Sequence, residues 1–94
     1  MKSFKDIVFK PHPVGEGLHG LLFFPNGYGV SVVRFKINGR HMSYTNNDNQ
    51  WELAVLFGDE NEWDITYNTP ITNNVMGHLS SDEVTKIMEK IQKL

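Results

Sequence analysis

The 94-residue sequence contains no cysteine, and this absence excludes several classes of protein together. A chain without thiols can form no disulfide framework, no thiolate zinc site and no cysteine nucleophile. Because small secreted domains commonly depend on disulfides, we expect a reducing, cytoplasmic location. The segment Met1–Asp6 also lacks the apolar stretch and the small-residue cleavage site of a signal peptide.

Long hydrophobic runs are also missing. Apolar runs such as Leu21–Phe24 are short, whereas a membrane-spanning helix needs about 20 apolar residues. We therefore expect a protein that does not cross a membrane. The length predicts a single domain over residues 1–94 with one modest core.

Basic residues are absent from the middle of the chain. The net charge is only −2, but residues 1–45 carry six basic and two acidic groups, a local charge of +4. Residues 46–64 carry no Lys or Arg and six acidic groups, namely Asp48, Glu52, Asp59, Glu60, Glu62 and Asp64. Segregated charge of this kind speeds and orients association with a partner.

Most of the remaining pattern predicts β-strands. Residues 28–37 are β-branched and aromatic, and Pro25-Asn26-Gly27 is a turn signal that joins them to the apolar run 18–24 in a hairpin. Residues 51–57 and 62–67 alternate in polarity around the turn 58–61, which predicts a second hairpin. The residues that we expect to face the core are Ser31, Val33, Phe35 and Ile37 in the first hairpin, and Trp51, Leu53, Val55, Phe57, Trp63, Ile65 and Tyr67 in the second.

The two ends of the chain differ in how clearly they predict structure. Pro11 and Pro13 exclude a central strand, so residues 1–20 are compatible with an edge strand, an arm or a swapped segment. Residues 75–79 predict a helical turn that ends at Gly77. Ser80 and Glu83 form a capping box, which is followed by apolar residues at helical spacing: Val84, Ile87, Met88, Ile91 and Leu94. The expected fold is α+β, an antiparallel meander of four to five strands with a C-terminal amphipathic helix packed on one face.

Motifs for catalysis or metal binding are weak. The four histidines have no ligand spacing. The stretch Asn46-x-Asp48-x-Gln50-x-Glu52 lacks the glycine and the distal glutamate of a calcium loop. The carboxylates of the second hairpin flank a turn, where water screens them, whereas acid–base catalysis needs a carboxyl in an apolar pocket. We therefore expect no enzyme, no catalytic residue, no metal and no cofactor.

Two surfaces are candidates for binding a macromolecule. The first is acidic and includes the long polar loop 38–50, with Tyr44 and Trp51 as possible aromatic anchors. Its expected partner-binding residues are Asp48, Asp59, Glu60, Glu62, Asp64, Tyr44 and Trp51. The alternative is a basic and aromatic patch for nucleic acid, formed by Arg34, Lys36, Arg40 and Tyr44.

Two stretches of the chain resemble a known family. They are residues 26–35 with 51–56, and residues 67–79 with Asp82-Glu83-Val84. They are similar, across residues 5–94, to a family of small uncharacterised proteins of tailed bacteriophages. An acidic pair often stands in that family where this chain has Asn73-Asn74. The resemblance implies a phage-encoded protein in the host cytoplasm, and it implies no activity, catalytic residue or cofactor.

Together these observations predict an accessory protein that binds a host protein, such as a component of a bacterial defence system, and inhibits it. The alternatives are nucleic-acid binding, a virion component, and a sponge for a nucleotide signal. The oligomeric state stays open, and a homodimer is compatible with the sequence.

Overall fold

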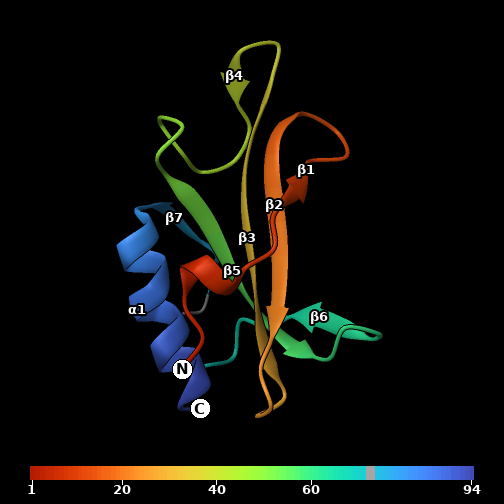
Figure 1. The fold of residues 1–94 in the computed structure, drawn as a ribbon, viewed down its shortest axis with the longest axis vertical. Coiled ribbons are helices and arrows are strands. Elements are labelled where there is room, and N and C mark those ends of the chain that lie inside the picture. Colours follow the sequence, from red (N-terminus) through yellow and green to blue (C-terminus); the bar gives the residue numbers. More distant parts are fainter. Residues whose placement is uncertain (72–73) are drawn as a thin grey trace.

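The computed structural model describes residues 1–71 and 74–94. It contains an antiparallel sheet with one α-helix packed against it (Figure 1), so the predicted α+β class is confirmed. The elements in chain order are η1 (Phe4–Asp6), β1 (Lys10–Pro11), β2 (Glu16–Phe23), β3 (Tyr28–Ile37), β4 (Arg40–His41), β5 (Trp51–Gly58), β6 (Trp63–Ile65), β7 (Met76–Leu79) and α1 (Ser81–Gln92).

The sheet is a meander whose main strand order is β1-β2-β3-β5-β6. The long strands β2, β3 and β5 form its centre, and β4 extends the pairing of β3 beyond them. The outer edge of β5 is shared by two strands, because β7 pairs with its first half and β6 with its last three residues. In the described residues the sheet has seven strands instead of the predicted four to five, because the two-residue strands β1 and β4 and the strand β7 also pair into it.

The first hairpin forms as its turn residues predict. Gly29 lies opposite Phe23, and Gly27 adopts a positive φ of 88°. The Asn26 side chain accepts a hydrogen bond from the backbone N–H of Tyr28 at 3.1 Å and donates one to the carbonyl of Ile91 at 2.9 Å. The turn is therefore tied to the end of α1.

The helix begins at the predicted capping box. The backbone N–H of Glu83 donates to Ser80 Oγ at 3.2 Å, and the N–H of Ser80 donates to Glu83 Oε1 at 3.0 Å. The bond from Ser80 lowers the pKa of the Glu83 carboxyl, because it stabilises the charged form. Val84, Met88 and Ile91 are buried against the sheet.

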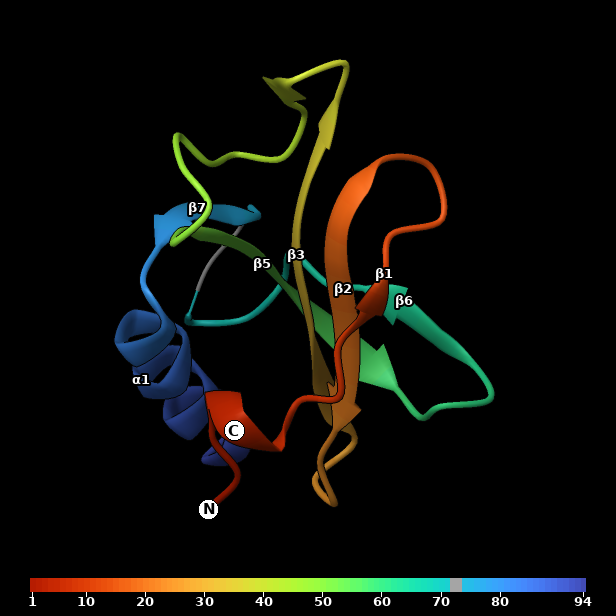
Figure 2. The same ribbon diagram turned by 45° about the horizontal axis from the view of Figure 1, so that its top comes forward.

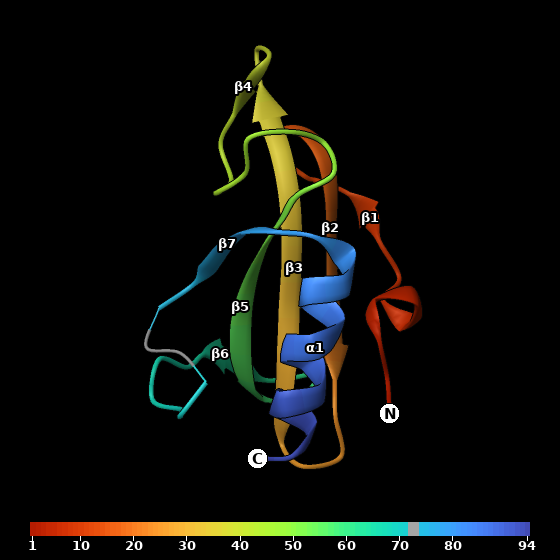
Figure 3. The same ribbon diagram turned by 90° about the vertical axis from the view of Figure 1, so that its left-hand side faces the viewer.

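The core lies on the face of the sheet that α1 covers, which we call the covered face (Figure 3). Strand β5 contributes Trp51, Leu53 and Val55 to it, as predicted. In β3, however, the core residues are Val30 and Val32, so the expectation that Phe35 and its neighbours face the core was wrong. The register explains the choice, because Val30 lies opposite Val55 and Val32 opposite Leu53, which makes this face continuous across both strands.

The N-terminal segment closes the core from the side. The sequence is compatible with an edge strand, an arm or a swapped segment here, and the structure has the edge strand. Lys10 and Pro11 of β1 pair with His19 and Leu18 of β2. The preceding turn lies beside α1, where the N–H of Phe4 donates to Thr85 Oγ1 at 3.1 Å.

Residues 76–79 are a strand, so the predicted helical turn was wrong. Tertiary pairing overrides the local pattern here, because Met76 lies opposite Leu53 and Leu79 opposite Trp51. A register shift separates the two pairs, and His78 has a positive φ of 56° within it. Asn73, one of the two residues that stand where the phage proteins often have an acidic pair, lies outside the described residues.

Candidate functional site

The β5–β6 hairpin is the strongest candidate for a binding surface. Its register places Leu56 opposite Ile65, Phe57 opposite Asp64, and Gly58 opposite Trp63. The hairpin projects from the sheet on the side remote from α1 (Figure 2).

Asp59 fixes the turn of this hairpin. Its Oδ1 atom accepts hydrogen bonds from the backbone N–H groups of Asn61 at 2.9 Å and Glu62 at 3.0 Å. The N–H of Gly58 donates to the carbonyl of Gly27 at 2.8 Å, which ties the hairpin to the first turn. Asp59 therefore has a local structural role, whatever else it contacts.

The other acidic side chains of the hairpin are exposed. In the described part of the chain, no basic side chain lies within 4.0 Å of Asp59, Glu60, Glu62 or Asp64. Their charge is thus not compensated within the protein, and we call these four residues the acidic rim. A partner with basic side chains would be attracted to this rim and oriented by it.

Large apolar side chains lie beside the acidic rim. The exposed fractions are 58% for Phe57, 42% for Trp63, 39% for Ile65 and 50% for Tyr67. The expectation that all four face the core was wrong. The register puts Trp63 and Ile65 on the face of Leu56, which is opposite to the face of Leu53 and Val55. Alternation in sequence shows which residues of one strand share a face, but it does not show which face of the sheet that is.

Trp63 and Ile65 belong to the second face of the sheet, which we call the open face because no helix in the described residues lies on it. The ring of Phe23 lies over Gly29, and its centroid is 6.5 Å from that of Trp63. Leu56 beneath them is fully buried. The open face thus has a packed base with the exposed side chains of Trp63 and Ile65 on it, bordered by the acidic rim.

This composition is typical of protein interfaces. Binding energy concentrates in aromatic side chains near the centre of an interface, and the charged surroundings contribute orientation and exclude water. Exposed apolar patches bordered by polar groups mark such sites on soluble proteins. Sequence reasoning found the acidic rim, but it missed the apolar centre because it assigned Trp63 and Ile65 to the core.

Three other predicted interface residues lie elsewhere. Trp51 is only 8% exposed and packs against Phe4 and Phe9, with ring centroids 5.3 and 4.7 Å away. It is a core residue, so its prediction as an anchor was wrong. Tyr44 is 58% exposed, but it lies beside β7, where its backbone carbonyl accepts a hydrogen bond from the N–H of His78.

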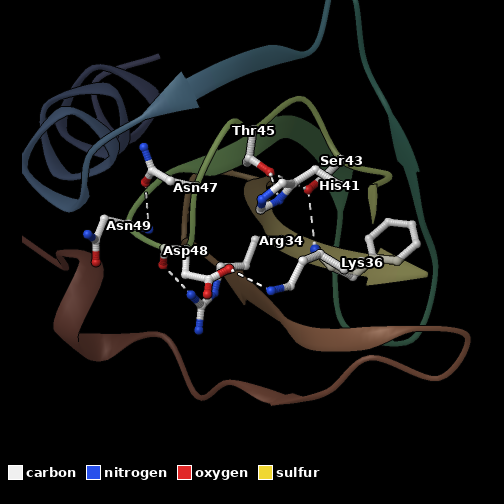
Figure 4. A network of polar contacts seen from close by, with 9 residues as sticks. Arg34, Lys36, His41, Ser43, Thr45, Asn47, Asp48 and Asn49 are labelled. Carbon is white, nitrogen blue, oxygen red and sulfur yellow. Dashed lines mark hydrogen bonds and ion pairs between the residues drawn. The ribbon is translucent and has the colours of Figure 1, made fainter. Parts of the chain in front are cut away.

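Asp48 does not join the acidic rim. Its carboxylate lies 3.4 Å from Lys36 Nζ, and its backbone carbonyl accepts from Arg34 Nη1 (Figure 4). The loop 38–50 thus places an acidic residue on the basic end of β3.

The basic residues predicted for nucleic acid do not form an open strip. The Arg34 guanidinium lies over the Trp51 ring, 4.9 Å from its centroid, and Lys36 is paired with Asp48. Arg40 is exposed in β4. The nearby ring of Phe35 is stacked on His12 at 3.8 Å, so it offers no free face there to a base.

The described residues contain no group of three or more His, Asp or Glu side chains placed to hold a metal ion. The side chains of the stretch that superficially resembles a calcium loop, Asn46-x-Asp48-x-Gln50-x-Glu52, do not converge on one point. Glu52 accepts from the N–H of Tyr44, Gln50 accepts from the N–H of Asn46, and Asp48 pairs with Lys36.

Among the described residues, no helix is long and apolar enough to cross a membrane.

Comparison of the chain with protein-family models, with curated proteins and with solved structures finds no match.

Proposed function

We propose that this chain is a small phage accessory protein that binds and inhibits a host protein in the host cytoplasm, with the β5–β6 hairpin as its interface. The observation that carries the proposal is the position of Trp63 and Ile65, exposed on the open face beside four carboxylates that have no ion-pair partner among the described residues. The resemblance to tailed-phage proteins supports the phage context, and a component of a bacterial defence system is the class of target that we favour.

The partner should present the complementary surface. An apolar pocket would receive Trp63 and Ile65, and Lys or Arg side chains around it would meet the acidic rim. Nucleic acid has less support as a partner, because Arg34 and Lys36 are engaged within the protein. No observation favours a virion component or a nucleotide sponge over protein binding.

The experiment is capture of host proteins by the tagged chain, followed by binding measurements with the purified partner. Glu60→Lys reverses one charge of the acidic rim, and Glu89→Lys makes the same change on the exposed side of α1. We expect Glu60→Lys to slow association and to reduce its dependence on salt, whereas Glu89→Lys should bind as the unmodified chain does.

Trp63→Ala tests the apolar centre separately. Removal of a central aromatic anchor commonly costs about 2 kcal/mol or more of binding free energy, and the loss falls mainly on the dissociation rate. Because Trp63 is 42% exposed, the fold should be retained. If Glu60→Lys and Trp63→Ala both bind the partner as Glu89→Lys does, the hairpin is not the interface. Light scattering of the purified chain checks whether the occupant of the open face is instead a second copy.

A further inference from the structure

A small polar cavity lies at the opposite end of the sheet from the hairpin, where the loop 38–50 folds back over β3 (Figure 4). Its volume is about 200 Å³, and its side chains are those of Glu16, Arg34, Phe35, Lys36, His41 and Asp48. Sites for drug-sized ligands occupy roughly 300–1,000 Å³. This cavity is therefore suited to a compact group that is recognised by polar contacts.

Three hydrogen-bond donors line the cavity. Arg34 and Lys36 stand two residues apart on β3, so their side chains leave the same face of the sheet. His41 lies opposite Lys36 in the register of β4. Two cations and an imidazole thus converge from adjacent strands that hold their positions.

A chain of buried hydroxyls orients His41. The N–H of Phe35 donates to Ser43 Oγ at 3.2 Å, Ser43 Oγ is 3.0 Å from Thr45 Oγ1, and Thr45 Oγ1 is 3.2 Å from His41 Nδ1. Both hydroxyls are satisfied when Ser43 donates to Thr45 and Thr45 donates to Nδ1. In that arrangement, neutral His41 carries its proton on Nε2, which makes Nε2 a donor.

Asp48 contacts both cations of the cavity, through two different groups. Its carboxylate pairs with Lys36, and its backbone carbonyl accepts a hydrogen bond from Arg34. The ion pair between Asp48 and Lys36 is weak because water screens it: the side chain of Asp48 is 62% exposed and that of Lys36 is 31% exposed. Arg34 Nε is buried and has no hydrogen-bond partner among the described residues, so this arrangement leaves one donor unused.

We propose that the cavity binds a compact oxyanion of single negative charge, and that Asp48 is an internal substitute which the ligand displaces. When Asp48 moves out, Arg34 and Lys36 face one remaining carboxylate, that of Glu16, so the lining has one uncompensated positive charge. A carboxylate or a phosphodiester group has the matching charge and offers two acceptor oxygens to these donors. The same site would disfavour a dianion because of Glu16.

Side-chain NMR of the two arginines tests the proposal, since Arg34 and Arg40 are the chain's only arginines. The probes are acetate, dimethyl phosphate and sulfate, titrated into the full chain at constant ionic strength. We expect the Nε–H signal of Arg34 to shift saturably with a monoanion, with a dissociation constant of about 1 mM, while that of Arg40 moves little. The tighter of acetate and dimethyl phosphate identifies the chemical source of the oxyanion.

Two variants separate displacement of Asp48 from a general effect of charge. Asp48→Asn should tighten monoanion binding about fivefold, the factor that corresponds to an exposed ion pair. Glu89→Gln, which removes the same charge on α1, should leave the affinity unchanged. Lys36→Gln should weaken binding, and the dispersion of the backbone spectrum verifies that each variant is folded.

An Arg34 signal that moves no more than that of Arg40 would overturn the site. Equal affinities in Asp48→Asn and Glu89→Gln would overturn the role of Asp48 as an internal substitute. Sulfate binding as tightly as the monoanions would overturn the assignment of a single charge.

Discussion

The two faces of the sheet consist of alternate residues of the same strands, yet only one of them is a core. On the covered face, Val30, Val32 and Leu53 are fully buried beneath α1. On the open face, Leu56 is equally buried, but Ile65 and Trp63 beside it remain exposed. Apolar content therefore does not distinguish the faces. The difference arises from where α1 packs, which leaves the open face available for a partner.

The largest effect that we expect from this comparison concerns stability. Leu53→Ala removes a fully buried side chain from the covered face and should lower the free energy of unfolding by about 2–5 kcal/mol. Ile65→Ala removes a side chain of the same size that is 39% exposed, so it should cost less than about half as much. Urea denaturation of both variants measures the difference. Equal losses would mean that the open face is itself a core, covered by a second copy of the chain.

The comparison also shows what the sequence could and could not predict. The turn at Asn26-Gly27, the capping box at Ser80 and the full extent of β3 follow from local chemistry, and the structure confirms each of them. The core face of β3 did not follow, because both of its faces begin with apolar or small residues. Only the pairing of Val30 with Val55, a contact between distant segments, determines the choice.

The candidate site was predictable in part for a similar reason. The acidic rim could be read from a run of residues without Lys or Arg, since a local turn keeps it together. The positions of Asp48 and Trp51 depend on how the loop 38–50 folds back, and polar loops carry little periodic signal. Asp48 pairs with Lys36 and Trp51 packs under Arg34, so the charges at this end of the sheet are largely compensated.

A smaller effect on the free energy of unfolding should follow from the protonation of His12, at the edge of the open face. His12 stacks on Phe35, and its Nδ1 accepts from the N–H groups of Val14 and Gly15 at 3.2 and 3.3 Å. Partial burial, and secondarily the proximity of His19, lower the pKa of His12 below its ordinary value of 6.5. The neutral form is therefore favoured by folding.

The sign of the dependence is fixed by linkage. Between the two pKa values the unfolded chain binds more protons at His12, so its contribution to stability is complete above pH 6.5 and is lost as the pH falls through the lowered folded pKa. Urea midpoints measured across this range should show the loss, and His12→Gln should reduce the slope. An unchanged slope in His12→Gln would assign the dependence to another group.

The smallest expected effect concerns Asp48, and it separates stability from binding at the basic end of β3. Because the Asp48–Lys36 pair is exposed, Asp48→Asn should change the free energy of unfolding by less than about 1 kcal/mol. Asn keeps the size of the side chain and the backbone carbonyl that accepts from Arg34. The urea midpoint of this variant, compared with that of Glu89→Gln, provides the measurement. A loss of unfolding free energy as large as that of Leu53→Ala would show that Asp48 holds the loop 38–50 in place. Asp48 would then be a structural residue, and its displacement by a ligand would cost too much free energy to occur.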